Sequence, residues 1–230
     1  MNFRHRSDQI EMMDDLDCKG PVIDQTLKEL DVINTLLGGN QISIQAFKRI
    51  VKSNPAIKRF VDLGCGGGDI LKVLANWCRK NGKKISFIGI DANPNIVAYA
   101  RKNCEKFPEI NIEQLNILDN SFDRLNYDLL HCCLFTHHFT NKELVGLFSK
   151  FHKANKAKVI INDLHRHPLA YYSIKWLTKI FSKSEMVRYD AGVSVLRGFR
   201  KEELQSILRE AGIQDFQLTW RWAFRWKLVF

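Results

Sequence analysis

The chain has 230 residues, enough for one large domain, and its 45% hydrophobic and 26% charged residues are ordinary for a soluble globular protein. It contains no apolar run long enough to cross a bilayer, and the polar, acidic start MNFRHRSDQIEMMDDLD argues against a signal peptide, so we expect a cytoplasmic protein. Of the net charge of +10, residues 151–230 contribute +8, which leaves nucleic acid, an anionic membrane, an acidic substrate or a merely solvated surface open.

The cysteines give no sign of a metal site or of a disulfide framework. They show neither paired C-x-x-C spacing nor the density of a secreted scaffold, and they stand at Cys18, Cys65, Cys78, Cys104, Cys132 and Cys133. We therefore expect reduced thiols and no bound metal.

Two helices are predicted before the first strand. Within residues 22–52, Gly38-Gly39 is a natural stop for a first helix, and a second helix begins near Ser43. The first helix is indicated by apolar residues at helical spacing: Leu27, Leu30, Ile33 and Leu37. We interpret residues 1–55 as an N-terminal helical extension or lid and residues 56–230 as the main domain.

From residue 59 onward, short apolar runs alternate with helical segments. The expected strands are Phe60–Leu63, Ser86–Ile90, Ile110–Leu115, Tyr127–Cys132 and Lys158–Asn162, with helices expected over 69–80, 94–105 and 141–153. This alternation predicts βαβ units and a parallel sheet covered on both faces.

Three further elements are expected after the fifth strand. Pro168 opens the amphipathic segment PLAYYSIKWLTKIF, whose apolar stripe is typical of core packing, although its position would also suit a substrate lid. A helix over 200–212 ends in glycine, and the tail FQLTWRWAFRWKLVF alternates as a hairpin would. The sequence thus predicts an α/β fold with a Rossmann-like, doubly wound, seven-stranded mixed sheet, an N-terminal helical extension and a helical lid after strand five.

A glycine-rich turn, VDLGCGGGDI at residues 61–70, follows the first strand, where a doubly wound sheet binds its ligand. A nicotinamide or flavin enzyme would need a third glycine where Asp69 stands, and no P-loop lysine is present. The acids Asp62 and Asp69 suit a cationic ligand better than a pyrophosphate, and S-adenosylmethionine carries a sulfonium and no phosphate. Asp91 closes the next strand, where its carboxylate is placed to bind both ribose hydroxyls.

Taken in order, VDLGCGGGD, FIGIDANP and YDLLHCCLFTHHF resemble the motifs of class I S-adenosylmethionine-dependent methyltransferases over residues 60–165. The late stretch SVLRGFRKEELQSILREAGI resembles a helix of the small-molecule members, and the ubiquinone/menaquinone-methyltransferase-like group is the most similar. The segments LDVINTLLGG and NDLHRHPLAYY look like a bacterial branch of that group, whose members act on phenolic polyketides or quinone-like rings.

This resemblance implies the contacts of the cofactor, S-adenosylmethionine. The main chain of Gly64, Cys65 and Gly66 would lie against the methionine and ribose, Asp62 would organise the turn, and Asp91 would bind the ribose. The remaining contacts would come from Ala92 on the adenine, from the amide oxygen of Asn116 and the backbone amide of Ile117 at the adenine edge, and from the backbone carbonyl of Cys132. Asn116 departs from the family pattern, which has an aspartate there.

Histidines follow the fourth and fifth strands, on the loops at the ligand-binding edge. Methyl transfer needs mostly alignment, and a base only if the acceptor must lose a proton, as a phenol would. We take His138 and His167 as candidate general bases, and expect substrate contacts from His137, His165 and Arg166, where arginine would hold an anionic oxygen. A packing role is the alternative for each histidine taken singly.

The sequence therefore predicts an S-adenosylmethionine-dependent methyltransferase (EC 2.1.1.-) that O-methylates a small aromatic or lipophilic acceptor, phenolic polyketide-like or quinol-like. An RNA or other nucleic-acid methyltransferase is the alternative raised by the basic C-terminal third, but the Asn/Asp-Pro-Pro-Tyr/Phe pattern is missing. A non-catalytic S-adenosylmethionine-binding protein is another, and an oxidoreductase the last. Lys175 and Lys179 raise the hypothesis of peripheral membrane contact. No oligomeric state is favoured.

Overall fold

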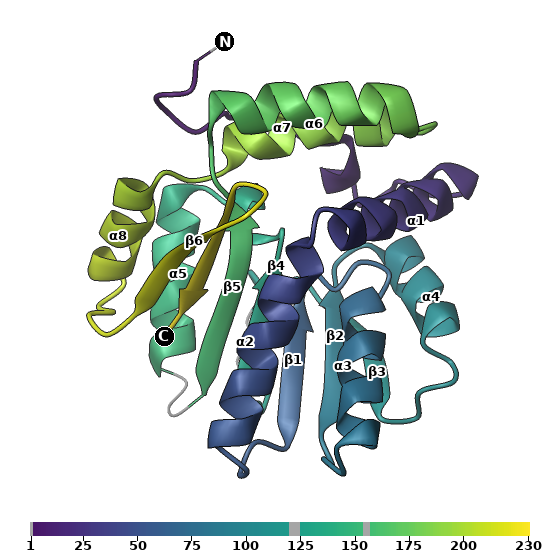
Figure 1. The fold of residues 1–230 in the computed structure, drawn as a ribbon, viewed down its shortest axis with the longest axis vertical. Helices are drawn as coiled ribbons and strands as arrows, with labels where there is room; N and C mark the ends of the chain where they lie inside the picture. Colours follow the sequence, from purple (N-terminus) through teal and green to yellow (C-terminus); the bar gives the residue numbers. More distant parts are fainter. Residues whose placement is uncertain (1, 120–124, 154–156) are drawn as a thin grey trace.

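A seven-stranded sheet forms the centre of the computed structural model, which describes residues 2–119, 125–153 and 157–230 (Figure 1). The strands are β1 (Arg59–Leu63), β2 (Ser86–Asp91), β3 (Ile110–Gln114), β4 (Leu129–Cys133), β5 (Lys158–Leu164), β6 (Gln217–Arg221) and β7 (Arg225–Val229). Their order is β3-β2-β1-β4-β5-β7-β6. The first five are parallel, and β7 pairs antiparallel with both β5 and β6.

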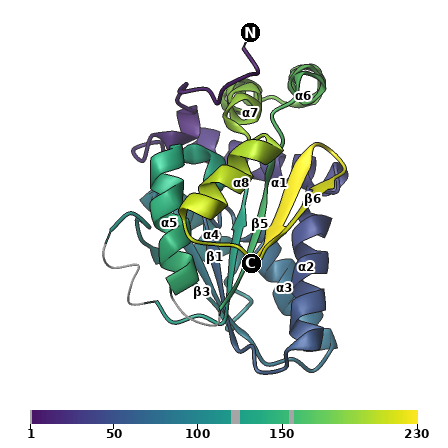
Figure 2. The ribbon, with the colours of Figure 1, turned by 90° about the vertical axis from the view of Figure 1, so that its left-hand side faces the viewer.

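Helices cover both faces of this sheet, as a parallel sheet requires. The helices α2 (Gly39–Ser53), α3 (Asp69–Lys80) and α4 (Pro94–Asn103) pack on one face, in one core cluster with Phe60 and Phe87. On the other face, α5 (Asn141–Lys153) and α8 (Lys201–Glu210) share a second cluster with Val61 and Leu63. Figure 2 shows the sheet between α5 on one side and α2 and α3 on the other.

The remaining helices lie across the carboxyl ends of the parallel strands (Figure 1). They are the short η1 (Met12–Asp14), α1 (Pro21–Leu36), the short η3 (Thr136–His138), α6 (Pro168–Phe181) and α7 (Glu185–Arg197). Proline at the first position starts both α1 and α6, and the Ser184 hydroxyl caps α7 by accepting from the Val187 amide. These elements enclose the edge of the sheet at which the glycine turn lies.

The fold predicted from the sequence is confirmed, including the C-terminal hairpin and the seven-stranded mixed sheet. Helix α2, which the sequence placed in the N-terminal extension, packs on the sheet through Phe47 and Phe60 of β1. It therefore forms part of one helical layer of the fold. Helix α7 was missed. Its buried residues include Asp190, Gly192 and Arg197 among the aliphatic ones, so its sequence carries no clear apolar stripe.

The apolar stripe of α6 does not pack in the core as its pattern indicated. Leu169, Tyr172, Trp176 and Ile180 are all more than half exposed, while the buried positions of the helix are Ala170, Tyr171 and Thr178. The core interpretation of this stripe is therefore wrong. In the part of the chain that the structure describes, no helix has the length and apolar character needed to cross a membrane.

Candidate active site

A cavity of about 990 Å³ opens at the carboxyl ends of β1, β2 and β4. Its floor is the glycine turn after β1, and its walls come from residues 11–16, α1, η3, α6, α7 and the turn between β6 and β7. This volume is at the upper end of what binds a drug-sized molecule, so the cavity has room for a nucleoside cofactor and a second ligand together.

Left-handed backbone conformations, which favour glycine, shape the floor of the cavity. Gly64, Gly66 and Gly68 have φ values of +66°, +51° and +76°. A Cβ on Gly64 would collide with the ring of Phe135, whereas a Cβ on Gly66 would meet only Leu27 Cδ2, at 3.8 Å. Gly66 therefore presents bare backbone to open space, as the close approach of a ligand requires.

Strained backbone recurs around the same cavity. The positive-φ residues other than glycine, among those described, are Leu134, Ala223 and Phe224, with φ between 52° and 57°. All three line the cavity, Leu134 directly after β4 and the other two in the β6–β7 turn. Such conformations cost about 1–2 kcal/mol each and cluster at ligand sites, which makes both walls candidates for ligand contact.

Asp91 lies at the end of β2 with its carboxylate at the cavity. It accepts hydrogen bonds from the backbone amides of Asn93, at 3.0 Å, and of Gly66, at 3.4 Å. Burial raises the pKa of Asp91 to about 6, against the effect of these two bonds. The carboxylate thus has unused acceptor capacity in the place where the ribose of the cofactor is expected.

We expect the affinity for S-adenosylhomocysteine to fall as the pH is lowered through about 6. Ribose hydroxyls donate to ionised Asp91, so the protonated form, which the free protein holds below pH 6, must lose its proton on binding. The dissociation constant should be about tenfold higher at pH 5 than at pH 7 by calorimetric titration.

The Asp91→Asn variant is the control, because Asp190 in the same cavity also has its pKa raised to about 6 by burial. In that variant the affinity should be weaker and nearly independent of pH over this range. An unchanged slope in the variant would assign the titration to Asp190, and a flat profile in the wild type would contradict the role given to Asp91.

Asp62 is buried beside the turn and is held from the side of α2. Its Oδ1 lies 2.7 Å from His131 Nδ1, and His131 Nε2 lies 2.8 Å from Ser43 Oγ. All three side chains are buried, and only Asp62 lines the cavity. The chain Asp62–His131–Ser43 fixes the aspartate behind the glycine turn, in keeping with an organising role.

The other residues expected at the cofactor lie along the cavity with one exception. Ala92, Asn116 and Ile117 all line it, and Asn116 Oδ1 accepts from the amide of Leu118 at 3.1 Å. Cys132 is buried between β1 and β5 and does not line the cavity, where Cys133 is found instead. At the end of β4, Cys133 therefore faces the cavity, whereas Cys132, for which the sequence predicted a backbone contact, does not line it.

His137 is buried between two carboxylates. Its Nδ1 lies 2.6 Å from Asp163 Oδ1 and its Nε2 lies 3.4 Å from Glu11 Oε1. Burial alone would lower the pKa of His137, but the charges of Asp163 and Glu11 outweigh it and raise the pKa to about 9. At neutral pH His137 is therefore an imidazolium that ties the N-terminal segment to β5, and it cannot accept a proton.

His138 is oriented by a carboxylate of the N-terminal segment. Its Nδ1 lies 2.5 Å from Asp14 Oδ1, and Asp14 also accepts from the guanidinium of Arg197 on α7. The side chain is about one-quarter exposed and lines the cavity. Asp14 thus orients the ring through Nδ1, and Nε2 makes no hydrogen bond to the described residues, which is the geometry expected of a candidate general base.

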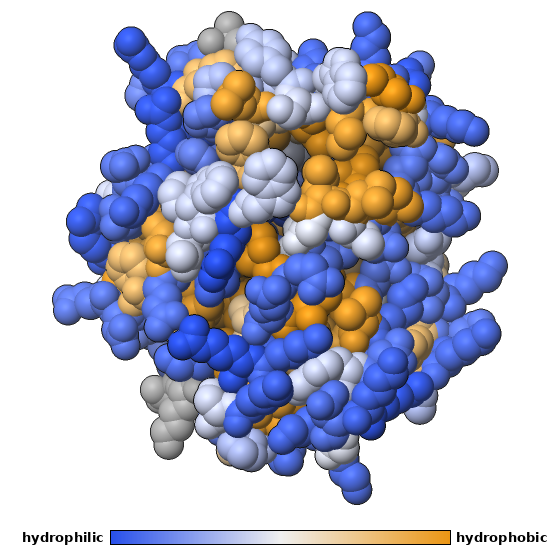
Figure 3. Space-filling view, viewed as in Figure 1, coloured by the Kyte–Doolittle hydropathy of each residue, from blue (hydrophilic) through white to orange (hydrophobic). Residues whose placement is uncertain are grey.

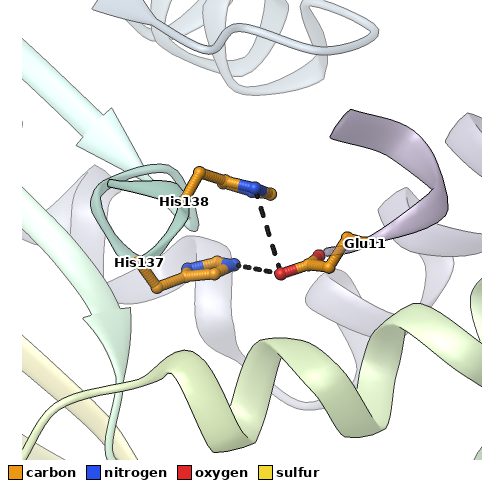
Figure 4. Close-up of side chains that lie close together, drawn as sticks. All are labelled: Glu11, His137 and His138. Carbon is orange, nitrogen blue, oxygen red and sulfur yellow. Dashed lines mark ion pairs between the residues drawn. The ribbon is translucent and has the colours of Figure 1, made fainter. Parts of the chain in front are cut away.

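Figure 4 shows Glu11, His137 and His138 converging from η3 and the N-terminal segment. Their ligand atoms lie within 4.8 Å of one another, a spacing that could hold a metal ion. Hydrogen bonds to carboxylates account for the positions of both histidines, with His137 on Asp163 and His138 on Asp14.

The cluster after β5 lies outside the cavity. Arg166 is fully buried and donates to Phe3 O, Arg4 O, Gly198 O and Glu203. His167 caps α6 by accepting from the Leu169 amide and stacks on Phe224, and His165 Nδ1 accepts from Trp220 Nε1. These contacts are structural, and the substrate role expected for this loop finds no support in the lining of the cavity.

Several residues of the site carried no signal in the sequence analysis. Glu11 and Asp14 come from a polar segment without a motif, and Arg225 from a strand whose basic residues alternate with apolar ones. Asp163 stood next to Asn162 inside an apolar strand, and this buried polar pair was the one available signal.

Comparison of the sequence with known proteins finds a family model and a relative. Residues 60–158 match the family model described as "Methyltransferase domain". The carboxy-S-adenosyl-L-methionine synthase of Sulfurimonas denitrificans is 28% identical over 173 residues, covering 70% of this chain and 72% of that protein.

Two solved structures show the same fold. The S-adenosylmethionine-dependent methyltransferase SibL in its apo form has a TM-score of 0.64 at 16% identity, covering 99% of this chain and 64% of that one. Human N-acetylserotonin methyltransferase, in complex with S-adenosylmethionine, has a TM-score of 0.60 at 15% identity, covering 90% of this chain and 55% of that one. This chain thus spans less than two thirds of the length of either.

Proposed function

We propose that this chain, an S-adenosylmethionine-dependent methyltransferase, transfers the methyl group to an oxygen of a small aromatic or lipophilic acceptor, phenolic polyketide-like or quinol-like. The sulfonium supplies the methyl group, and the residues of this chain align the two reactants and exclude water. Methyl transfer of this kind is an in-line displacement, in which alignment supplies most of the acceleration.

The observation that carries the proposal is the shared cavity. The glycine turn and Asp91, which are the expected cofactor contacts, open into the same 990 Å³ space as the apolar side chains of the lid. That lid is formed by Leu30, Ile33 and Leu37 of the α1 region, by Ile174, Trp176 and Leu177 of α6, and by Trp222 and Phe224. An apolar, aromatic wall favours a ring-bearing or lipophilic acceptor over a nucleic acid.

The rim of the cavity is apolar on its outer side as well. Figure 3 shows hydrophobic side chains gathered over α6 and α1, where Trp176, Ile180, Phe181 and Leu36 are more than half exposed. This rim supports entry of a lipophilic acceptor between the two helices. Peripheral contact of Lys175 and Lys179 with an anionic membrane stays a prediction on the same basis.

The proton of a hydroxyl acceptor has a candidate destination among the histidines after β4 and β5. His138 lines the cavity and Asp14 holds its Nδ1, which leaves Nε2 for the acceptor. His137 is kept protonated, and His167 lies in the cap of α6. These placements support His138 over His167 as the general base.

Methyl transfer to a panel of phenols and quinols tests the proposal. We expect S-adenosylhomocysteine and an acceptor heavier by one methyl group, measured by mass spectrometry. Binding of the cofactor without methylation of any acceptor, or methylation of RNA instead, would contradict it. So would a cofactor product heavier than S-adenosylmethionine, such as the compound for which the Sulfurimonas relative is named.

A further inference from the structure

Arg225 is a buried cation with unused donors at the wall of the cavity. It is the first residue of β7, lines the cavity and is only 3% exposed. Its Nη2 donates to Asn34 Oδ1 at 2.9 Å. Its Nε and Nη1 are buried without any hydrogen-bond partner among the described residues. A buried guanidinium left in this state is unfavourable, and an anionic ligand would offset that cost.

Arg225 also lacks a counter-ion among the described residues, where no carboxylate forms an ion pair with it. Burial lowers its pKa, with only partial compensation from Cys133 and Asp163. Cys133 stays neutral, because burial raises its pKa to about 12, and Asp163 is bound to His137. The buried Arg166 is different, since Glu203 and three carbonyls satisfy it.

The junction between α1 and α2 packs closely against the guanidinium. A Cβ on Gly39, the first residue of α2, would lie 3.0 Å from Nη2, so the junction between α1 and α2 leaves space for this group. The preceding residues, Trp222 to Phe224, form the strained turn that lines the cavity. The strained backbone of this turn thus lies directly before an arginine whose buried donors are unpaired. Such a combination is typical of a ligand site.

The order of the strands places Arg225 far from the expected binding site of the nucleoside. The ribose and adenine contacts lie at β2 and β3, whereas β7 is two positions beyond β4 in the sheet. At about 4.8 Å between strands, the backbone of Arg225 is roughly 10 Å past β4. Its side chain contacts Asn34 and packs against Gly39, at the junction between α1 and α2. The guanidinium therefore lies at the α1–α2 side of the cavity, away from the expected ribose and adenine contacts.

We propose that Arg225 binds an anionic oxygen of a molecule in the cavity, so that this wall is a carboxylate or phenolate subsite. Two sources share this chemistry: an anionic group of the acceptor, and the methionine carboxylate of the cofactor. An arginine can present two parallel donors to such a group. The inference rests on the proposed function only in that the cavity holds a cofactor and an acceptor.

Binding measurements test this subsite without requiring turnover. Arg225→Met removes the charge, Arg225→Lys keeps it, and Lys227→Met, two residues along the same strand and partly exposed, is the matched control. The probes for the cofactor are S-adenosylhomocysteine and 5′-methylthioadenosine, which lacks the amino-acid part. The probes for the acceptor, used on protein saturated with S-adenosylhomocysteine, are 1-naphthoate and its neutral analogue 1-naphthamide.

Calorimetric titration separates the two sources. If Arg225 binds the cofactor carboxylate, Arg225→Met should lower the affinity for S-adenosylhomocysteine at least tenfold and leave the affinity for 5′-methylthioadenosine unchanged. If Arg225 binds the acceptor, Arg225→Met should lower the affinity for 1-naphthoate at least tenfold and leave the affinity for 1-naphthamide unchanged. Arg225→Lys should retain part of the affinity, and Lys227→Met all of it.

Unchanged affinities for both anionic probes in Arg225→Met would overturn the proposal. If Arg225→Met does not fold, two other measurements decide. Either 1-naphthoate must raise the melting temperature of the wild type more than 1-naphthamide does, or Arg225→Lys must lower the affinity for S-adenosylhomocysteine but not for 5′-methylthioadenosine. Absence of both effects would equally overturn it. Failure of methyl transfer in the acceptor panel would leave these binding results in place, so the two proposals fail separately.

Discussion

The Gly66→Val variant is expected to lose S-adenosylhomocysteine binding by more than 100-fold while keeping its fold. The Cβ at this position would point into the cavity, with Leu27 at 3.8 Å as its nearest neighbour outside the turn. A valine would therefore occupy the space in which the cofactor approaches the backbone. The positive φ of +51° adds strain of about 1–2 kcal/mol, which should lower the melting temperature by several degrees without unfolding the protein.

Gly82→Val is the matched control for that strain. Gly82 has a φ of +62°, no atom within 4 Å of the position that a Cβ would take, and no part in the lining of the cavity. It should lose similar stability and retain full affinity, as measured by thermal melting and calorimetric titration. Retained affinity in Gly66→Val would show that the glycine turn is not the contact surface.

The His138→Ala variant is expected to lower kcat for a phenolic acceptor by about 100-fold or more, with the dissociation constant of S-adenosylhomocysteine changed less than threefold. A positioned base contributes on this scale when the acceptor must lose a proton. Added imidazole should restore part of the rate, because the alanine leaves room beside Asp14 for the missing ring. A merely structural role would not respond to imidazole.

His167→Ala is the matched control, since His167 caps α6 and does not line the cavity. It should cost about 1 kcal/mol of stability and change kcat less than threefold. If His167→Ala alone lost turnover, the general base would instead be assigned to His167, on the loop after β5. If neither variant lowers turnover by more than a few-fold, no histidine of this pair is the base.

Much of the fold could be predicted because its signals are local. The glycine turn, the strand ending in Asp91 and the alternation of strands and helices each depend on a few neighbouring residues. The cofactor side followed from the same signals, since a parallel sheet brings the carboxyl ends of its strands to one edge. Asp62, Gly66 and Asp91 accordingly meet at one cavity.

The acceptor side could not be predicted in the same way, because it depends on contacts between distant segments. Asp14 meets His138 across 124 residues, and Asn34 meets Arg225 across 191. The stripe of α6 misled for a related reason: an apolar helical pattern indicates a buried face, but it does not distinguish a core from the rim of a cavity. Arg166 and His167 were expected on a loop at the ligand-binding edge, and their contacts with residues 3–4 and with the start of α6 could not be read from the sequence.

A crystal structure of the protein with S-adenosylhomocysteine tests the central claim most directly. The account predicts both ribose hydroxyls on the Asp91 carboxylate, the homocysteine part against Gly64–Gly66, and the sulfur facing the space between α1, α6 and His138. A nucleoside bound in the opposite direction, or outside this cavity, would contradict it.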